Sequence, residues 1–457
     1  MMGCKAAAGI PVSQIAEEFH SSRQYVYQQK KRVLDDGNSM DMESASVPVI
    51  PLDERFIKRM VLSLSLDCHA PAEGIQRTFS SVFNMHISIG KISAILQEAS
   101  ERAQLFDSQI PLDSISQGAN DEIFQGNTPI LTGIDPESTY IYLLAEAGDR
   151  SADTWELYME ECKDHGLNLD VSISDAGTGL TAGIPHAFPD ICIQPDVFHE
   201  LRPLGAEVSR LERKACRLIG KEAALEKRTH GKHPRKKTQG QLEQVQLEAE
   251  QAVKEYDILS ILFGWLVELV GFSGYPYKDV LALAQWVLSE MEAAFPDREK
   301  LLAQTSKFRK KLPEILLFLN RLQAGLERKA EEKGIPPEAF SILYYEKALP
   351  PLSCEYNQLE YELGALLGNR YEETKEEFNQ VLASVKRASS LVENLNSRIR
   401  VYIDLKRRVP ERYFVLMKVY FNTKKYRRSR VPERIGKSPL ELMTGQAYPE
   451  FLDALGY

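Results

Sequence analysis

The sequence has 457 residues, which is enough for about two to four domains with a sizeable hydrophobic core. Apolar residues make up 43% and charged residues 26% of the chain, as in soluble globular proteins, which excludes a disordered tail, a collagen and a small disulfide-stapled protein. The net charge of −9, if evenly spread, argues against binding to nucleic-acid phosphates. The six cysteines include no Cys-x-x-Cys pair, so the sequence predicts a reducing compartment rather than a zinc knuckle.

The most apolar stretch of the sequence covers residues 256–272. It is shorter than the roughly 20 residues that span a bilayer, and it contains Asp257 and Glu268. We therefore expect a buried core helix here and no membrane partner. Because the first residues also lack the apolar centre of a signal peptide, the sequence predicts a cytoplasmic protein, nucleoid-associated if it binds DNA.

Residues 1–36 predict a helix-turn-helix DNA-binding domain. A first helix begins after Pro11 with an apolar face that includes Ile15 and Phe19, and residues 20–22 form a short polar turn. The second helix carries four basic residues, no acidic residue in its first turns, and polar side chains suited to base edges. The DNA-contact candidates on it are Arg23, Gln24, Lys30, Lys31 and Arg32. A small helical hairpin without a role in DNA binding is the alternative.

The next segments alternate between helical and strand patterns. Residues 37–51 predict a linker, and residues 52–107 predict a second helical domain, in which Ser88 begins the last helix. That domain is either a second helix-turn-helix or a spacer. Residues 115–203 predict three antiparallel strands, a helix, and a strand–helix–strand unit, which together make a mixed α/β layer.

The remainder of the chain is predicted to be helical. Residues 204–378 form a helical block, residues 379–408 one further helix, and residues 409–457 a basic C-terminal segment. Residues 398–437 contain 14 Lys and Arg against 3 acidic residues, a net +11, and residues 221–237 add a net +5. Four tyrosines interleave with the larger basic run, namely Tyr402, Tyr413, Tyr420 and Tyr426. Such a strip suits a phosphate backbone, and Arg398 and Arg400 are its first DNA-contact candidates.

Three acidic residues are placed as a metal-dependent catalytic site would need them. Asp121 lies on the first strand, Asp175 directly follows an apolar strand in the motif SDAGTG, and Glu393 lies on the late helix. Three carboxylates from these positions suit two Mg²⁺ or Mn²⁺ ions, since both metals prefer oxygen ligands. Asp135 is the alternative first aspartate, although its Asp-Pro-Glu-Ser context favours a turn. The alternatives to Glu393 are Glu362, Glu372 and Glu377.

The order of these features resembles the DDE-type transposases of prokaryotic insertion sequences. The most specific pieces are SDAGTG around Asp175, ENLNSRIR around Glu393, and the closing RIGKSPLELMTG at 434–445. The resemblance implies a ribonuclease-H-like catalytic domain in which Asp121, Asp175 and Glu393 bind two Mg²⁺ or Mn²⁺ ions. Asp196 and His199 are similar to the Cys/Asp-x-x-His signature of hAT-like and Mutator-like transposases, which implies a supporting role at the active site.

The spacing departs from a compact domain of that fold. Asp175 and Glu393 are 218 residues apart, so residues 204–378 must be an insertion. Asn396 and Arg400 share a helix face with Glu393 and are expected to support the site. Trp265 and Trp286 lie in the insertion, where core packing is the ordinary expectation and stacking on a DNA base is the alternative.

The expected fold is therefore α/β plus α, a ribonuclease-H-like mixed sheet interrupted by an all-helical insertion and preceded by helix-turn-helix domains. The expected function is cleavage at the ends of a mobile element followed by strand transfer. The implied partners are double-stranded DNA, as terminal inverted repeats and as target, and a second copy of the chain, because two ends must be paired. The alternatives are a catalytically inactive DNA-binding derivative, a nuclease of the same fold without strand transfer, and a coiled-coil scaffold built on the helical block.

Overall fold

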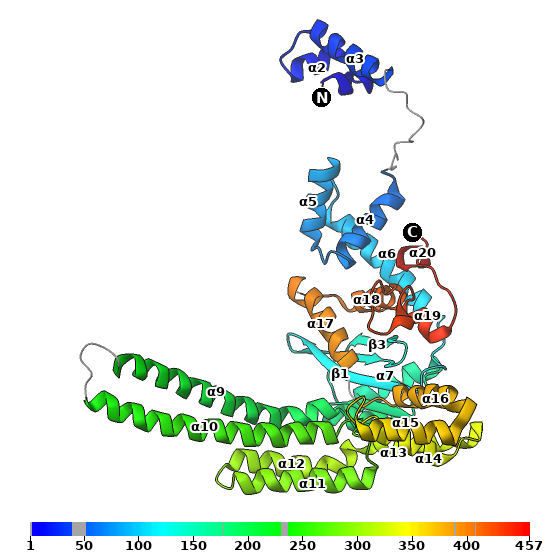
Figure 1. Ribbon diagram of the computed structural model, residues 1–457. Coiled ribbons are helices and arrows are strands. Elements are labelled where there is room, and N and C mark those ends of the chain that lie inside the picture. The colour runs from blue at the N-terminus through cyan, green and yellow to red at the C-terminus, as the bar shows by residue number, and fades with distance from the viewer. Residues whose placement is uncertain (1, 39–51, 176, 230–235, 388–389, 407) are drawn as a thin grey trace. The chain divides into compact units, whose positions relative to one another are not determined.

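A computed structural model describes residues 2–38, 52–175, 177–229, 236–387, 390–406 and 408–457 (Figure 1). The chain divides into two compact units, Met1–Ile57 and Lys58–Tyr457. Most of the predicted linker at 37–51 lies outside the described residues. Each unit is described by itself.

The first unit is a small helical cluster. Its helices are α1 (Met2–Ala7), α2 (Val12–Glu18) and α3 (Arg23–Asn38). Ala6, Ile15 and Val26 bring one apolar side chain from each helix to a shared core. The two helices predicted within 10–34 are therefore present, and α1 supplies the third side of their core.

The second unit begins with three helices that pack against the end of the chain. They are α4 (Glu54–Leu66), α5 (Ala72–Phe83) and α6 (Ile89–Asp107), and the Ser88 side chain caps α6 as predicted. The hydroxyl groups of Ser65 and Tyr413 lie 2.9 Å apart, and Lys418 pairs with Asp107 at 2.8 Å. These contacts make the helices of 52–107 part of the larger unit.

A five-stranded mixed sheet forms the centre of the second unit. Its strands are β1 (Gln117–Gln125), β2 (Thr128–Ile134), β3 (Ile141–Glu146), β4 (Val171–Ser174) and β5 (Cys192–Pro195). They lie in the order β3-β2-β1-β4-β5. The first three strands are antiparallel, while β4 runs parallel to both β1 and β5. The predicted mixed α/β layer is confirmed.

Helices cover both faces of this sheet. The connecting helices α7 (Ala152–Asp164) and α8 (Thr178–Ala187) pack on one face, where Trp155 bonds to Glu122 of β1. Helix α17 (Ser390–Leu405) lies on the other face, where Asn396 bonds to Asp121. Consecutive residues of a strand point to opposite faces, so these two bonds fix the sides on which α7 and α17 lie.

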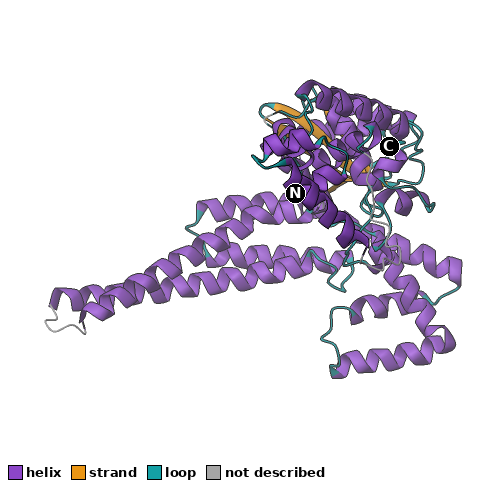
Figure 2. Ribbon diagram, turned by 90° about the horizontal axis from the view of Figure 1, so that it is seen from above, coloured by secondary structure: helices purple, strands orange, loops and turns teal. Residues whose placement is uncertain are grey.

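Residues between β5 and α17 form a helical block, as the sequence predicts. Its α-helices are α9 (Val197–Thr229), α10 (Lys236–Leu269), α11 (Tyr277–Ala294), α12 (Glu299–Ile315), α13 (Leu317–Lys333), α14 (Pro337–Glu346), α15 (Cys354–Leu367) and α16 (Tyr371–Ser384), with a 3₁₀ turn at Gly368–Arg370. Helices α9 and α10 form a long antiparallel hairpin that extends away from the strands (Figures 1 and 2). The Gln194 side chain joins the block to β5 through a 3.0 Å bond to the Ile315 carbonyl.

The chain ends in short helices packed against the sheet and α6. They are α18 (Glu411–Thr423), a 3₁₀ turn at Pro432–Arg434, α19 (Pro439–Thr444) and α20 (Phe451–Ala454). Ser438 and Glu441 form a reciprocal capping box at the start of α19, within the closing motif noted in the sequence. Among the described helices, none is long and apolar enough to cross a membrane.

Candidate active site

The register of the parallel strands aligns three aspartates. Ser174 pairs with Asn120 on one side and with Pro195 on the other, and an aspartate follows each of these three residues. The resulting row consists of Asp121, Asp175 and Asp196. Two of the three carry the predicted catalytic role, and the third opens the predicted Asp-x-x-His motif.

Asp121 is tied to helix α17 by a direct side-chain contact. The Asn396 Nδ2 group donates a hydrogen bond of 2.5 Å to Asp121 Oδ2, and the backbone N–H of Glu122 donates one of 2.8 Å to Oδ1. Asn396 is 1% exposed, and its Oδ1 atom has no hydrogen-bond partner among the described residues. Glu393 lies one turn before Asn396 on the same helix, so α17 brings an amide and a carboxylate to the strand.

The pKa of Asp121 responds to its burial and to the charges of the neighbouring carboxylates. Burial, followed by the negative charges of Asp175, Glu122 and Glu393, raises the pKa of Asp121 to about 6, against the opposing effect of its bond to the Glu122 N–H. In the structure, the charges of Asp175 and Glu393 therefore both act on the Asp121 carboxyl group. No cation pairs with Asp121 among the described residues.

The SDAGTG motif turns the chain from β4 into α8. The Gly177 N–H donates to Asp175 Oδ1 at 3.3 Å, so the turn holds this carboxylate at the end of its strand. A Cβ atom on Gly179 would lie 1.9 Å from the Arg150 carbonyl. Gly179 therefore allows α8 to approach the backbone at the start of α7.

Glu122 is an acidic neighbour of this site that the sequence reasoning missed. Its Oε1 atom accepts a 2.9 Å bond from Trp155 Nε1, and its Oε2 atom lies 3.4 Å from Arg150. Its side chain is 11% exposed. The double acid at 121–122 was a visible signal, but strand alternation sends the second carboxylate toward α7, where Trp155 and Arg150 engage it.

The side chains of Asp121, Asp175, Glu393 and Asn396 have the chemistry to bind a hard cation, although the three carboxylates lie apart from one another. Oxygen donors dominate the site, burial and then like charges raise the pKa of Asp121, and the buried Oδ1 atom of Asn396 lacks a partner in the described structure. Within the described ranges, no three His, Cys, Asp or Glu side chains lie close enough to hold one ion jointly. The residue types therefore fit Mg²⁺, and holding an ion between the carboxylates would require them to move closer together.

The structure gives Asp196 a local role. Asp196 is 3% exposed, and its Oδ1 atom accepts a 2.9 Å bond from the backbone N–H of His199, as an N-cap of α9 does. The His199 side chain is exposed at the first turn of that helix. The capping contact explains the Asp-x-x-His spacing without a ligand.

The alternative acids differ from the chosen ones in their surroundings. The Asp135 carboxylate accepts bonds from the backbone N–H groups of Glu137 and Ser138 at 3.1 and 2.9 Å, which is the geometry of a turn former. Glu377 pairs with Lys333 at 2.8 Å within the helical block. Glu362 and Glu372 are exposed on α15 and α16. Of these acids, Glu393 is the one whose charge acts on Asp121.

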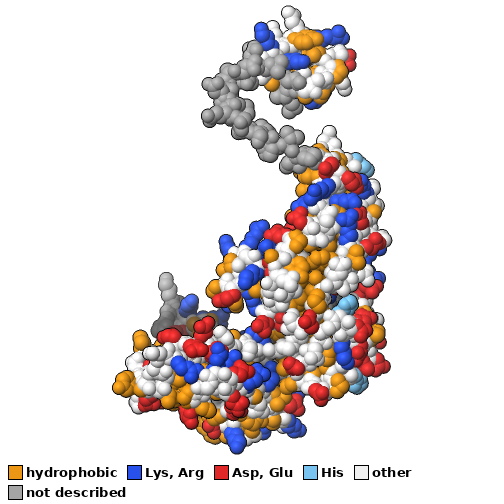
Figure 3. All heavy atoms as spheres, turned by 90° about the vertical axis from the view of Figure 1, so that its right-hand side faces the viewer, with side chains coloured by type: hydrophobic (Ala, Val, Ile, Leu, Met, Phe, Trp, Pro, Cys, Tyr) orange, Lys and Arg blue, Asp and Glu red, His pale blue; other side chains and the backbone are white. Residues whose placement is uncertain are grey.

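The basic C-terminal run is less positive in the structure than along the sequence. Lys418 pairs with Asp107, Lys424 with Asp67, Lys425 with Glu441 and Arg408 with Glu146. These acids come from other parts of the chain or from beyond the counted window, so the net +11 did not include them. Figure 3 shows acidic and basic side chains interspersed over the displayed face of the second unit.

The interleaved aromatic residues turn inward, contrary to the expected DNA-binding strip. Tyr402, Tyr413 and Tyr420 are 1%, 4% and 4% exposed. The Arg398 guanidinium lies 3.9 Å from the centre of the Phe421 ring, and burial lowers the pKa of this arginine. Arg398 therefore packs between α17 and α18, whereas Arg400 is exposed. Apolar faces of these two helices account for the aromatic spacing.

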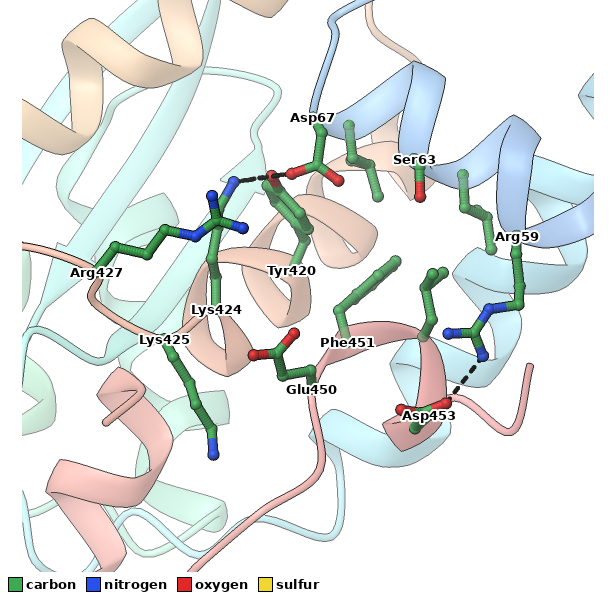
Figure 4. Close-up of a pocket in the computed structure, with 13 residues that line it drawn as sticks. Arg59, Ser63, Asp67, Tyr420, Lys424, Lys425, Arg427, Glu450, Phe451 and Asp453 are labelled. Atoms are coloured by element: carbon green, nitrogen blue, oxygen red, sulfur yellow. Dashed lines mark hydrogen bonds and ion pairs between the residues drawn. The ribbon is translucent and has the colours of Figure 1, made fainter. Parts of the chain in front are cut away.

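A short basic loop keeps exposed cations on the surface. Its neck is closed where Tyr426 and Ile435 form a β-bridge, and the Tyr426 hydroxyl lies 2.6 Å from Thr139 Oγ1. Three arginines of this loop are described without an ion pair, namely Arg427, Arg428 and Arg430. The hollow beside the loop, about 190 Å³, mixes Arg59, Lys424 and Arg427 with nearby acids (Figure 4).

In the first unit, helix α3 presents the predicted DNA-contact residues on its surface. Arg23, Gln24 and Lys31 are exposed, and Lys30 is half-buried. The side chain of Arg32 lies outside the described residues. Tyr25 and Tyr27 are also exposed, at 46% and 59%. This face can therefore offer both cations and aromatic rings to a partner.

The chain matches no protein-family model, and no curated protein shows significant similarity to it. The function proposed below therefore rests on the residues and contacts of this chain.

Proposed function

We propose that this protein is a DDE-type DNA transposase that cleaves the ends of a mobile element and joins them to target DNA. The observation that carries the proposal is the placement of Asp121 on β1 beside Asp175 at the end of β4, with α17 and its Glu393 held against Asp121 by Asn396. Burial raises the pKa of Asp121, and the charges of Asp175 and Glu393 raise it further. A structural turn or cap would not need carboxylates from β1, the end of β4 and α17 together.

The topology supports a ribonuclease-H-like domain as the scaffold. A three-stranded antiparallel meander is followed by two strands parallel to β1, in the order β3-β2-β1-β4-β5. The parallel strands place their C-terminal ends at one edge of the sheet, where open α/β sheets bind ligands. The helical block enters the chain between β5 and α17, consistent with an insertion in this domain.

Asp121, Asp175 and Glu393 are the proposed ligands for Mg²⁺ or Mn²⁺, and two ions would suit the reaction. Bound metal would supply Lewis acidity for phosphoryl transfer between the DNA backbone and water or a 3′-hydroxyl group. Asn396 would orient Asp121 through its amide, and the exposed Arg400 lies on the same helix as Glu393, where a guanidinium can hold a phosphate. Asp196 and His199 would act indirectly, by fixing the start of α9 next to this edge.

DNA would be bound by helix α3 and by the exposed arginines of the loop at 427–430. Helix α3 offers Arg23, Gln24 and Lys31 to base edges and phosphates. Because two element ends must be joined in one reaction, we propose that at least two copies act together on DNA. We propose that the working protein is associated with the chromosome in the cytoplasm.

The test is a strand-transfer assay on DNA that carries the sequences flanking the gene. The wild-type protein with Mg²⁺ is expected to join these ends to a supercoiled plasmid, and Asp175→Asn is expected to lose both cleavage and joining. Asp190→Asn, which changes an exposed aspartate before β5, is the matched control. Full cleavage by Asp175→Asn, with unchanged metal dependence, would refute the proposal.

The same assay separates the proposal from a nuclease without strand transfer. Such a nuclease would cleave the ends in a metal-dependent reaction but leave no joined product. A catalytically inactive DNA-binding derivative would bind the ends and leave them intact. The presence of Asp121, Asp175 and Glu393 weighs against an inactive DNA-binding protein, because DNA binding alone does not require these three carboxylates near one another.

A further inference from the structure

The middle of helix α10 carries an exposed apolar stripe. The apolar stretch at 256–272 predicts a helix buried on all sides, but Ile258, Ile261 and Trp265 are 46%, 54% and 45% exposed. Residues such as Ala252, Leu259 and Leu266 on the opposite face are buried. That buried face packs on α9 and its neighbours, so the exposed stripe points away from the protein's own core.

The stripe has the spacing of a helix–helix seam. Its members, at intervals of four, three, four and three residues, are Lys254, Ile258, Ile261, Trp265 and Glu268. All five are exposed, and this interval pattern is that of the a and d positions along which two helices pack. Tryptophan and isoleucine at such positions are costly to leave in water.

The ends of the stripe carry opposite charges at equal distances from its centre. Lys254 lies seven residues before Ile261 and Glu268 lies seven residues after it. If two copies of α10 pack antiparallel about a two-fold axis at Ile261, each Lys254 faces Glu268 of the other copy. Ile258 then lies level with Gly264 of the other copy, one residue before Trp265. Among the described residues neither Lys254 nor Glu268 has an ion pair, so both are available for this contact.

Helix α11 widens the surface beside the stripe. The Trp265 and Trp286 rings stack with centres 6.1 Å apart at an angle of 21°, and Trp286 is 49% exposed. A hollow of about 520 Å³ lies between α10 and α11, lined by both tryptophans and by Leu283. The hollow borders the Glu268 end of the stripe, where an antiparallel second copy would place its Lys254.

We infer that α10 forms a homodimer interface in which two copies of this stripe pack antiparallel about Ile261. A second copy is the occupant because the stripe is complementary to itself in charge under two-fold rotation, with an apolar centre between the charged ends. The interface forms without DNA or metal. It is therefore independent of the catalytic proposal, and either one can fail without the other.

The test is sedimentation velocity of the full-length protein without DNA. The wild type is expected to be a dimer at about 50 µM, well above a micromolar dissociation constant. Ile261→Lys places two like charges at the axis and is expected to weaken the dimer by roughly a hundredfold or more. Leu157→Lys, at an exposed leucine of α7, should leave the dimer intact.

Charge exchange tests the antiparallel register. Lys254→Glu and Glu268→Lys are each expected to weaken the dimer, and the double exchange is expected to restore it. Thermal melting of each variant reports whether the fold is kept. A monomeric wild type, a dimeric Ile261→Lys variant, or a double exchange that is no better than the single ones would overturn the inference.

Discussion

The side-chain amide of Asn396 donates a 2.5 Å hydrogen bond to the carboxylate of Asp121, although 275 positions separate the two residues in the chain. This bond fixes α17 on β1 and places Glu393, one turn earlier, beside the strand. It also leaves the buried Oδ1 atom of Asn396 without a partner in the described structure. Asn396 is thus the residue that joins the late helix to the sheet at the proposed active site.

The raised pKa of Asp121 predicts a specific dependence of stability on pH. A carboxyl group with a folded-state pKa of about 6, against an ordinary 3.8, binds its proton more tightly in the folded protein. The contribution of Asp121 to the free energy of unfolding is fully present below about pH 4. It is lost as the pH rises through about 6, and the loss is on the order of 3 kcal/mol.

Asp121→Asn removes the charge, so the variant should be more stable than the wild type at pH 7 and lose this advantage near pH 4. Urea denaturation of both proteins at the two pH values measures the difference, with other titrating groups in common. An equal difference in unfolding free energy at both pH values would contradict the electrostatic account of the site.

Mg²⁺ should stabilise the wild-type protein through the same carboxylates. A ligand that binds only the folded state stabilises it by RT ln(1 + L/Kd), where L is the free ligand concentration, and so raises the unfolding midpoint. We expect millimolar Mg²⁺ to raise the thermal midpoint of the wild type and to have little effect on Asp121→Asn or Asp175→Asn. An equal rise in all three proteins would place the metal elsewhere.

Asn396 should matter for activity as well as for the packing of α17 on β1. Asn396→Ala removes the donor to Asp121, and loss of such an orienting contact typically costs about 10- to 100-fold in metal affinity or activity. Ser397→Ala is the matched control, because the exposed Ser397 hydroxyl bonds only to the Glu393 carbonyl of its own helix. Cleavage rates as a function of Mg²⁺ concentration distinguish the two variants. Equal rates for both would remove Asn396 from the site.

The exposed loop arginines should contribute to DNA binding through phosphates. Replacing Arg427, Arg428 and Arg430 with Gln is expected to reduce the slope of log K against log salt by about 2 to 3, since each phosphate contact contributes about 0.9. Arg408→Gln is the control, because Arg408 pairs with Glu146 at 3.3 Å. Binding of a DNA duplex over a salt series measures the slopes. An unchanged slope in the triple variant would exclude this loop from the interface.

Local patterns in the sequence located most elements of the fold. Apolar periodicity placed the helices and strands, and Ser88 was identified as a cap because N-caps depend on neighbouring residues alone. The three acids were also visible, since each lies in a distinct local setting. The family resemblance implied that Asp121 and Glu393 share one site, but the direct bond between Asp121 and Asn396 was not predicted.

The errors came from features that depend on distant parts of the chain. The net +11 near the C-terminus counted no acids from elsewhere, and folding brings Asp67 and Asp107 to it. The tyrosines there were expected at the surface but pack inward, because α17 and α18 bury their aromatic faces. Trp265 shows the opposite error, because core packing was expected and the side chain is 45% exposed. Its helix has an apolar face that no other part of the described chain covers.

The most direct test of the proposed active site compares Glu393→Gln with Glu362→Gln in Mg²⁺-dependent cleavage of the flanking DNA. Both changes remove one carboxylate charge from an exposed helix position, but only Glu393 acts on Asp121. The account predicts that Glu393→Gln loses at least about a hundredfold in cleavage rate, as removal of an essential catalytic group does, and that Glu362→Gln cleaves as the wild type. Wild-type cleavage by Glu393→Gln would contradict the account.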